Sequence, residues 1–139
     1  MGATATAGEG GLRAVRPLPH VDVIDERMRQ LDKWGVQDHP SVAPELKASA
    51  DRLRASGYPA SYAVACVFRD LGIPTATRAR EDCQARSAKG DTWAHIIVEE
   101  LAEAVEAATL HGDGPELRAE VVQVAAVAVA WLEALDRRA

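Results

Sequence analysis

The 139-residue sequence is poor in aromatic side chains, with one phenylalanine, two tyrosines and three tryptophans. Alanine is abundant instead, and it is the strongest helix former. Together with the spaced glycines and prolines, this composition favours packed helices over sheets. The length is that of one domain, which is large enough to bury a core.

Cysteine is also scarce. The two cysteines, Cys66 and Cys83, lie 17 residues apart, which is not a zinc-site spacing, and we interpret them as buried thiols in a reducing compartment. No signal peptide is recognisable, and the longest apolar run, residues 121–132, is too short to cross a bilayer. We therefore expect a cytoplasmic protein with no membrane partner.

Basic residues are outnumbered, with 16 lysines and arginines against 21 acidic residues and a formal net charge of −5. This balance argues against nucleic acid as the main partner, but not against a small anionic substrate carried by a divalent cation. The sequence also lacks a Gly-rich phosphate loop and a Ser/His/Asp-type pattern, and its four histidines have no ligand-like spacing.

The first ordered element is predicted to follow a flexible tail, residues 1–19, leaving one domain at 20–139. Apolar residues in the segment before Gly35 recur with the 3–4–3 spacing of a buried helical stripe. They are Val21, Ile24, Met28 and Leu31. Three shorter helices are expected within 44–57, 59–72 and 73–90, the last capped by Thr75.

The C-terminal half predicts two longer helices. One begins after an Asp91 or Thr92 cap and runs over about 93–110, and the other covers about 117–135. The break HGDGPE between them is short, so an antiparallel hairpin is the natural arrangement. The predicted fold is therefore an all-α bundle with a C-terminal helix hairpin.

Four glutamates crowd the first of these helices, at positions 99, 100, 103 and 106. A solvated polar face is the plain interpretation of such a pattern. However, like charges one turn apart repel each other by about 0.2–0.5 kcal/mol, and residues 94–117 contain no lysine or arginine to offset this. The missing counter-charge could instead be a metal ion.

The second helix is apolar on all sides over residues 121–132, apart from Gln123. A helix without a polar face needs cover all round, from other helices, from a second subunit or from both. Glu120 lies on the same stripe as Val124 and Trp131, where an uncompensated carboxylate is costly. Glu100 and Glu103 are spaced i,i+3, as are Glu120 and Gln123, so the two pairs can converge on one Mg²⁺.

These residues resemble the MazG-like, all-α nucleotide pyrophosphohydrolases. EELAE at 99–103 and EVVQ at 120–123 correspond to the EExxE and ExxD motifs of that family, and ERMRQLDKWGVQDHP is similar to the segment that precedes them. The resemblance covers residues 21–39 and 92–138. It implies Mg²⁺-dependent (or Mn²⁺-dependent) cleavage of a nucleoside triphosphate to monophosphate and pyrophosphate, by a homodimer or homotetramer.

The resemblance also implies roles for individual residues. Glu100, Glu103 and Glu120 would bind the metal with Gln123, and Glu99 would orient them or position the attacking water beside Glu100. Gln123 departs from the family, which has aspartate there. Three outcomes stay open: a slower enzyme, one with fewer metals, or a fold without the reaction. The rival hypothesis is accordingly a catalytically silent helical module that binds nucleotide or a protein.

Two further pairs of residues are candidate nucleotide contacts. Trp34 could stack on a base and Lys33 could contact a phosphate, although Trp34 also fits the apolar end of the first helix. Arg78 and Arg80 are possible phosphate contacts, although a solvated helix face fits both better. A helix-turn-helix regulator would use TRAREDCQARSAK as its recognition helix, but the acidic pair Glu81–Asp82 argues against it.

Overall fold

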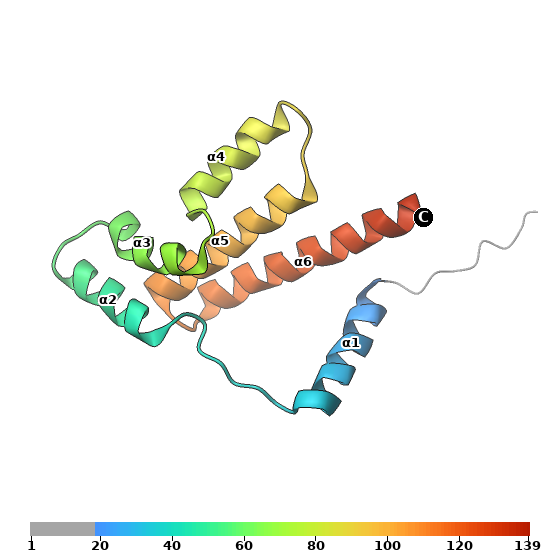
Figure 1. The fold of residues 1–139 in the computed structure, drawn as a ribbon, viewed down its shortest axis with the longest axis horizontal. Coiled ribbons are helices and arrows are strands. Elements are labelled where there is room, and N and C mark those ends of the chain that lie inside the picture. Colours follow the sequence, from blue (N-terminus) through green and yellow to red (C-terminus); the bar gives the residue numbers. More distant parts are fainter. Residues whose placement is uncertain (1–18) are drawn as a thin grey trace, which may run out of the picture.

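The computed structural model describes residues 19–139 and folds them into six α-helices, with no strand in that range. The helices are α1 (Pro19–Trp34), α2 (Pro44–Ala55), α3 (Ala60–Leu71), α4 (Ala76–Ser87), α5 (Trp93–His111) and α6 (Pro115–Arg138) (Figure 1). The predicted all-α class is confirmed. Most of the predicted tail, residues 1–18, lies outside the described residues, and its last residue, Pro19, begins α1.

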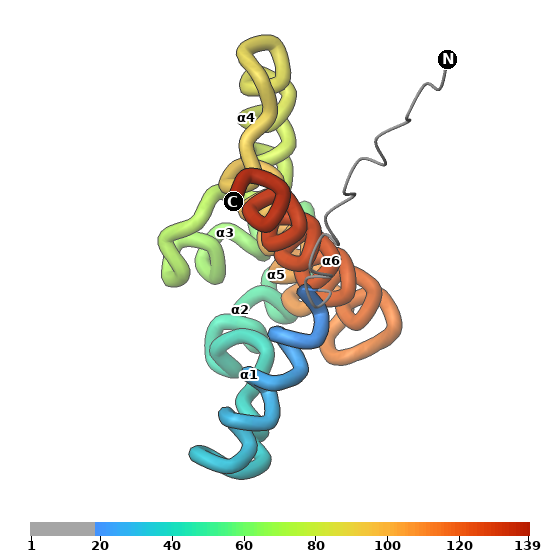
Figure 2. The backbone as a smooth tube through the Cα atoms, turned by 90° about the vertical axis from the view of Figure 1, so that its right-hand side faces the viewer, coloured from blue at the N-terminus to red at the C-terminus, as the bar shows by residue number. Residues whose placement is uncertain are grey.

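α5 is the helix on which the rest of the bundle is assembled, since it contacts α2, α3, α4 and α6. Its contact with α6 is the most extensive in the protein, and the chain reverses at Gly112 so that α6 returns alongside α5 (Figures 1 and 2). The face of α5 turned to its neighbours is built largely from alanines. Ala102, Ala104, Ala107 and Ala108 are all buried. Small side chains at these positions allow the neighbouring helices to approach closely.

The hydrophobic core lies where α3 and α4 pack against α5. Its buried members are Val64, Val67, Phe68, Ala76, Ala79, Ala102 and Val105. The amphipathic pattern of α3 explains its contribution, because Val64, Val67 and Phe68 fall on one side of that helix. The core therefore fixes the position of α5 relative to α4, and these two helices carry the charged groups described below.

Local capping explains where several helices begin and end. The hydroxyl of Thr75 accepts a hydrogen bond from the amide of Arg78, which confirms the predicted N-cap of α4. Of the two predicted alternatives for α5, Asp91 and Thr92, the cap is Thr92, whose hydroxyl accepts a hydrogen bond from the amide of His95. Gly72 ends α3 in the left-handed conformation with φ 68°, which is strained for any side chain. α6 begins at Pro115, two residues before the predicted start, because the fixed φ of proline suits the first helical position.

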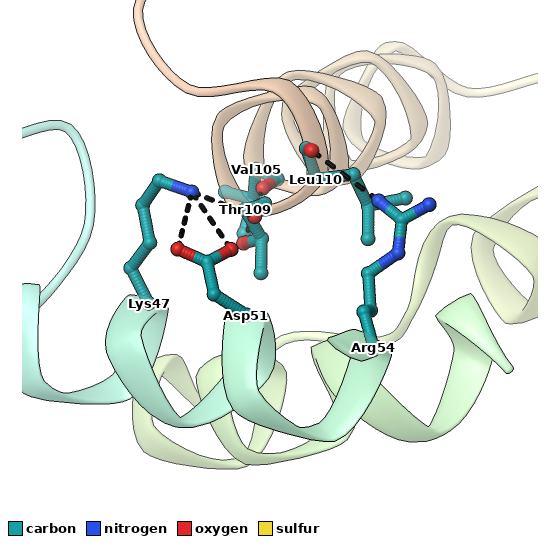
Figure 3. Close-up of polar contacts among 6 residues, drawn as sticks. All are labelled: Lys47, Asp51, Arg54, Val105, Thr109 and Leu110. Carbon is teal, nitrogen blue, oxygen red and sulfur yellow. Dashed lines mark hydrogen bonds and ion pairs between the residues drawn. The ribbon is translucent and has the colours of Figure 1, made fainter. Parts of the chain in front are cut away.

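The C-terminal end of α5 is capped by basic side chains from α2 (Figure 3). Lys47 Nζ lies 3.3 Å from the carbonyl oxygen of Thr109 and is also paired with Asp51, and Arg54 donates to the carbonyl of Leu110 at 3.3 Å. Carbonyls at the end of a helix lack partners within the helix, and they carry the negative end of its dipole. The two cations satisfy both requirements and attach α2 to α5.

Two apolar surfaces remain uncovered, which corrects the predicted burial of the first helix. Ile24 and Met28 of α1 are 56% and 55% exposed, because α1 contacts α6 alone among the described helices. Val121 and Val122 of α6 are 51% and 50% exposed, so the other helices of the chain do not cover α6 on every side. None of the described helices has the length and apolarity that spanning a membrane requires.

The placement of the core makes a direct prediction about stability. Val67→Ala removes two methyl groups from a side chain that is 1% exposed, and should lower the free energy of unfolding by about 2 kcal/mol in urea denaturation. Val36→Ala is the matched control, since the same change at a side chain that is 90% exposed should cost under about 0.5 kcal/mol. Equal losses in the two variants would show that the core lies elsewhere.

Candidate metal centre

Three carboxylates from two helices converge on one point of the surface. Glu100 and Glu103 come from the middle of α5, and Glu120 comes from the first turns of α6. One oxygen from each side chain lies within 4.8 Å of the corresponding oxygens of the other two. All three residues are half-buried, so the carboxylates are drawn together at the seam between α5 and α6 instead of spreading into solvent. A single cation would fit within reach of all three.

Glu100 is the carboxylate most affected by this crowding. Its partial burial raises its pKa above the ordinary value of 4.5, and the negative charges of Glu103, Glu99 and Glu120 raise the pKa further. Both effects disfavour the ionised form of the side chain. The protein thus holds together charges that repel each other, at a place where a bound cation would remove the repulsion.

Arg80 supplies the positive charge that α5 lacks. Its Nε lies 2.9 Å from Oε1 of Glu103, and the exposed fractions of the two side chains are 46% and 25%. The hydrogen bond to Glu103 raises the pKa of Arg80, and the charges of Glu103, Glu106 and Glu99 act in the same direction. The packing of α4 against α5 brings this arginine to the glutamates.

An open pocket of about 360 Å³ lies beside the carboxylates. It is lined by Arg80, Glu103, Glu106, Ala107, Leu110, His111, Glu116 and Glu120. Its size is in the range of small-molecule sites. Apart from His111, Arg80 is the only basic side chain among these lining residues.

Glu99 points to a different neighbour. The thiol of Cys83 on α4 donates to the carbonyl of His95 at 3.2 Å. Burial raises the pKa of this thiol to about 12, helped by the nearby Glu99 and its negative charge. Glu99 is therefore close to Cys83 as well as to Glu100, and it is not one of the three converging carboxylates. The half-buried Cys83 and Cys66 are both free thiols.

The other predicted site residues, Gln123, Lys33 and Trp34, do not belong to the group of three carboxylates. Gln123 lies one turn after Glu120 on α6 and is exposed. Lys33 Nζ stands 4.8 Å from the centre of the Trp34 ring, and Trp34 is 54% exposed rather than the buried end of a stripe. These two residues end α1, which contacts α6 but not α5 among the described helices, and they do not line the pocket. The structure thus brings together Glu100, Glu103 and Glu120, but not Lys33 and Trp34.

The sequence analysis named Arg80 as a possible phosphate contact but favoured a solvated helix face, and it did not predict the ion pair of Arg80 with Glu103. That interpretation suits Arg78, which is 68% exposed and paired with Asp82 on its own helix. One signal was available in the sequence. The break between the α4 and α5 segments is short, and short connections place consecutive helices side by side. The base missing from residues 94–117 could have been sought on the preceding helix.

Comparisons of the chain with protein-family models, curated proteins and solved structures find no match.

The raised pKa of Glu100 predicts a pH-dependent gain in stability for Glu100→Gln. The folded protein holds the Glu100 proton more tightly than the unfolded chain does, so stability falls as the pH rises from 4.5 through the raised pKa. With EDTA at pH 7, the variant should be more stable than the wild type by about 0.5 kcal/mol, the scale of like-charge repulsion. The difference should shrink as the pH falls through the raised pKa and should disappear below pH 4.5.

Thermal unfolding followed by circular dichroism across this pH range measures the effect. Glu133→Gln, at an exposed position of α6, removes the same charge outside the cluster and should show no such pH-dependent gain. A destabilised Glu100→Gln variant at pH 7 would mean that the carboxylate is stabilised in place, contrary to the predicted repulsion.

Proposed function

We propose that this protein is a Mg²⁺-dependent nucleoside triphosphate pyrophosphohydrolase of the MazG-like type, which converts a (d)NTP to the monophosphate and pyrophosphate. The observation that carries the proposal is the convergence of Glu100, Glu103 and Glu120 from α5 and α6. The motifs that resemble the family are the ones that supply these three side chains. Their i,i+3 and cross-helix placement is the arrangement that the resemblance implies.

The donor set fits Mg²⁺, with Mn²⁺ as the natural substitute. Mg²⁺ prefers carboxylate oxygens, keeps several waters, and is commonly bound by a few carboxylates together with the phosphates of a substrate. Three half-buried carboxylates, with a pocket open to solvent beside them, leave room for both. When bound, the ion supplies the positive charge and Lewis acidity that phosphoryl chemistry needs.

The chain's own residues then have separate tasks. Glu100, Glu103 and Glu120 hold the cation at the seam between α5 and α6, and the pocket bordered by Glu106 and Leu110 receives the substrate. Glu99 is next to Glu100 and outside the group of metal ligands, which suits it to position the attacking water. Lys33 and Trp34 are left out of the proposed site, because α1 does not carry them to this pocket.

The proposed assembly is a homodimer or homotetramer in which a second copy completes the helix hairpin formed by α5 and α6. Support comes from exposed apolar side chains on neighbouring helices. They are Val21, Val23, Ile24 and Met28 of α1, Leu101 of α5, and Val121, Val122, Leu132 and Leu135 of α6. Exposed apolar side chains in such numbers are typical of interfaces between subunits.

A second candidate function is a catalytically silent module of the same fold, which binds nucleotide or a protein through this pocket. Gln123 favours it, since an amide in place of the family's aspartate removes one negative charge from the site. The ion pair of Arg80 with Glu103 also favours it, because a basic side chain already occupies one of the proposed ligands. Metal-dependent turnover separates the two functions.

Pyrophosphate release from a panel of canonical and modified (d)NTPs, with Mg²⁺ or Mn²⁺, is the first test of the enzyme. We expect release that needs the metal, is abolished by EDTA, and falls by about a hundredfold or more in Glu103→Gln because a ligand is lost. Glu133→Gln, which removes a glutamate from the exposed side of α6, should keep the wild-type rate.

The role of Gln123 is tested with Gln123→Asp in the same assay. Restoring the family's residue adds a negative charge one turn from Glu120, so activity should be equal to or higher than that of the wild type. Silence of both the wild type and Gln123→Asp with every nucleotide would reject the enzyme in favour of the silent module.

The assembly makes an independent prediction that analytical ultracentrifugation checks. The wild type should sediment as a dimer or tetramer, and Val122→Asp should weaken association by at least about tenfold, because a carboxylate would be buried without a partner. Val36→Asp is the control, since Val36 is 90% exposed and lies outside the helices. A wild type that sediments as a monomer would contradict the proposed assembly.

A further inference from the structure

The pairing of Arg80 with Glu103 has a feature that an ordinary surface ion pair lacks. Its acidic member is one of the three converging carboxylates, and both partners line the same pocket. The charges of Glu106 and Glu99 also act on Arg80. A basic side chain therefore lies on the boundary between the carboxylates and the open space beside them.

Arg78 shows what an arginine without this placement does. It lies on the same helix and makes an ion pair at 3.0 Å with Asp82, one turn along α4. It is 68% exposed and does not line the pocket. The two arginines have the same charge and the same parent helix, but only Arg80 reaches across to α5.

We propose that Arg80 exchanges partners during binding: it neutralises Glu103 while no metal is present, and moves to a phosphate of the nucleotide once Glu103 binds the cation. This inference rests on the proposed function and adds to it a substrate-binding residue and a device that couples metal binding to substrate binding. The planar guanidinium suits both partners, because carboxylates and phosphates each accept paired hydrogen bonds from it.

The exchange has a direct physical consequence. A guanidinium on Glu103 competes with the metal for the same carboxylate, so metal binding must displace it. The displaced arginine stays at the rim of the pocket, since α4 remains packed on α5, with Ala79 of α4 and Ala102 of α5 both buried in the core. There the arginine meets the negative charge of an incoming triphosphate. The triphosphate then replaces Glu103 as the anionic partner of Arg80.

Mn²⁺ binding to the purified full chain tests the first half of the exchange, with electron paramagnetic resonance as the readout and no turnover required. Arg80→Ala should bind Mn²⁺ about threefold more tightly than wild type, the factor expected for losing a competing, partly exposed ion pair. Arg78→Ala removes the same charge from the same helix and should bind Mn²⁺ as wild type does. Arg80→Lys keeps the charge and should stay near the wild-type Kd.

Binding of an α,β-imido nucleoside triphosphate in saturating Mn²⁺ tests the second half. Arg80→Ala should weaken this binding by about tenfold, as expected when a charge-assisted contact to phosphate is lost, whereas Arg80→Lys should recover part of it. Arg78→Ala should again match wild type. Thermal unfolding of each variant confirms that the fold is retained.

The outcomes separate this inference from the proposed function. If Mn²⁺ binds but Arg80→Ala and Arg78→Ala give the same Kd, the competition at Glu103 is overturned and the metal site stands. If Arg80→Ala leaves the affinity for the nucleotide analogue unchanged, the move to phosphate is overturned. If neither the wild type nor Arg80→Ala binds Mn²⁺, both the exchange and the proposed function fail.

Discussion

The packing of α5 is the constraint on which the rest of the structure depends. One face of this helix is built from alanines and Val105, and it brings α3, α4 and α6 close together. The face beside it carries the glutamates. Because both faces belong to one rigid helix, the positions of Glu100 and Glu103 are set by the packing of the core. Glu120 joins them because α6 packs along α5.

This arrangement puts stability and charge in opposition. Packing forces the carboxylates together, and the repulsion among them is offset only in part by Arg80, whose side chain is half exposed. Proteins commonly retain destabilising groups of this kind where a ligand relieves them. On the proposed function, the ligand is a divalent cation, and the free energy of its binding includes the repulsion that it removes. The same site would then be less stable when no cation is bound.

Local signals made part of this structure predictable. Apolar spacing predicts the helices at both ends of the chain, and short-range hydrogen bonds explain the caps at Thr75 and Thr92. The i,i+3 spacing of Glu100 and Glu103 places their carboxylates next to each other on one helix. The ion pair of Arg80 with Glu103 joins residues 23 apart in the sequence, and no periodicity reports it. The exposure of Ile24 and Met28 could not be predicted either. An apolar stripe indicates that one side of a helix packs against something, but it does not indicate whether the same chain provides the contact.

The segment that joins α1 to α2 has a consequence for how copies of the chain associate. Residues 35–43 contain no helix, and among the described helices α1 contacts only α6. The same side chains of α1 therefore make the same contacts whether they dock on their own α6 or on that of another copy. In the proposed dimer or tetramer, exchange of α1 between subunits would cost little contact energy, so the reach of the connecting segment and the protein concentration would decide between closed and swapped assemblies. In that proposed assembly, the length of the connecting segment would determine which copy of α6 each α1 can reach, independently of the chemistry of the carboxylates.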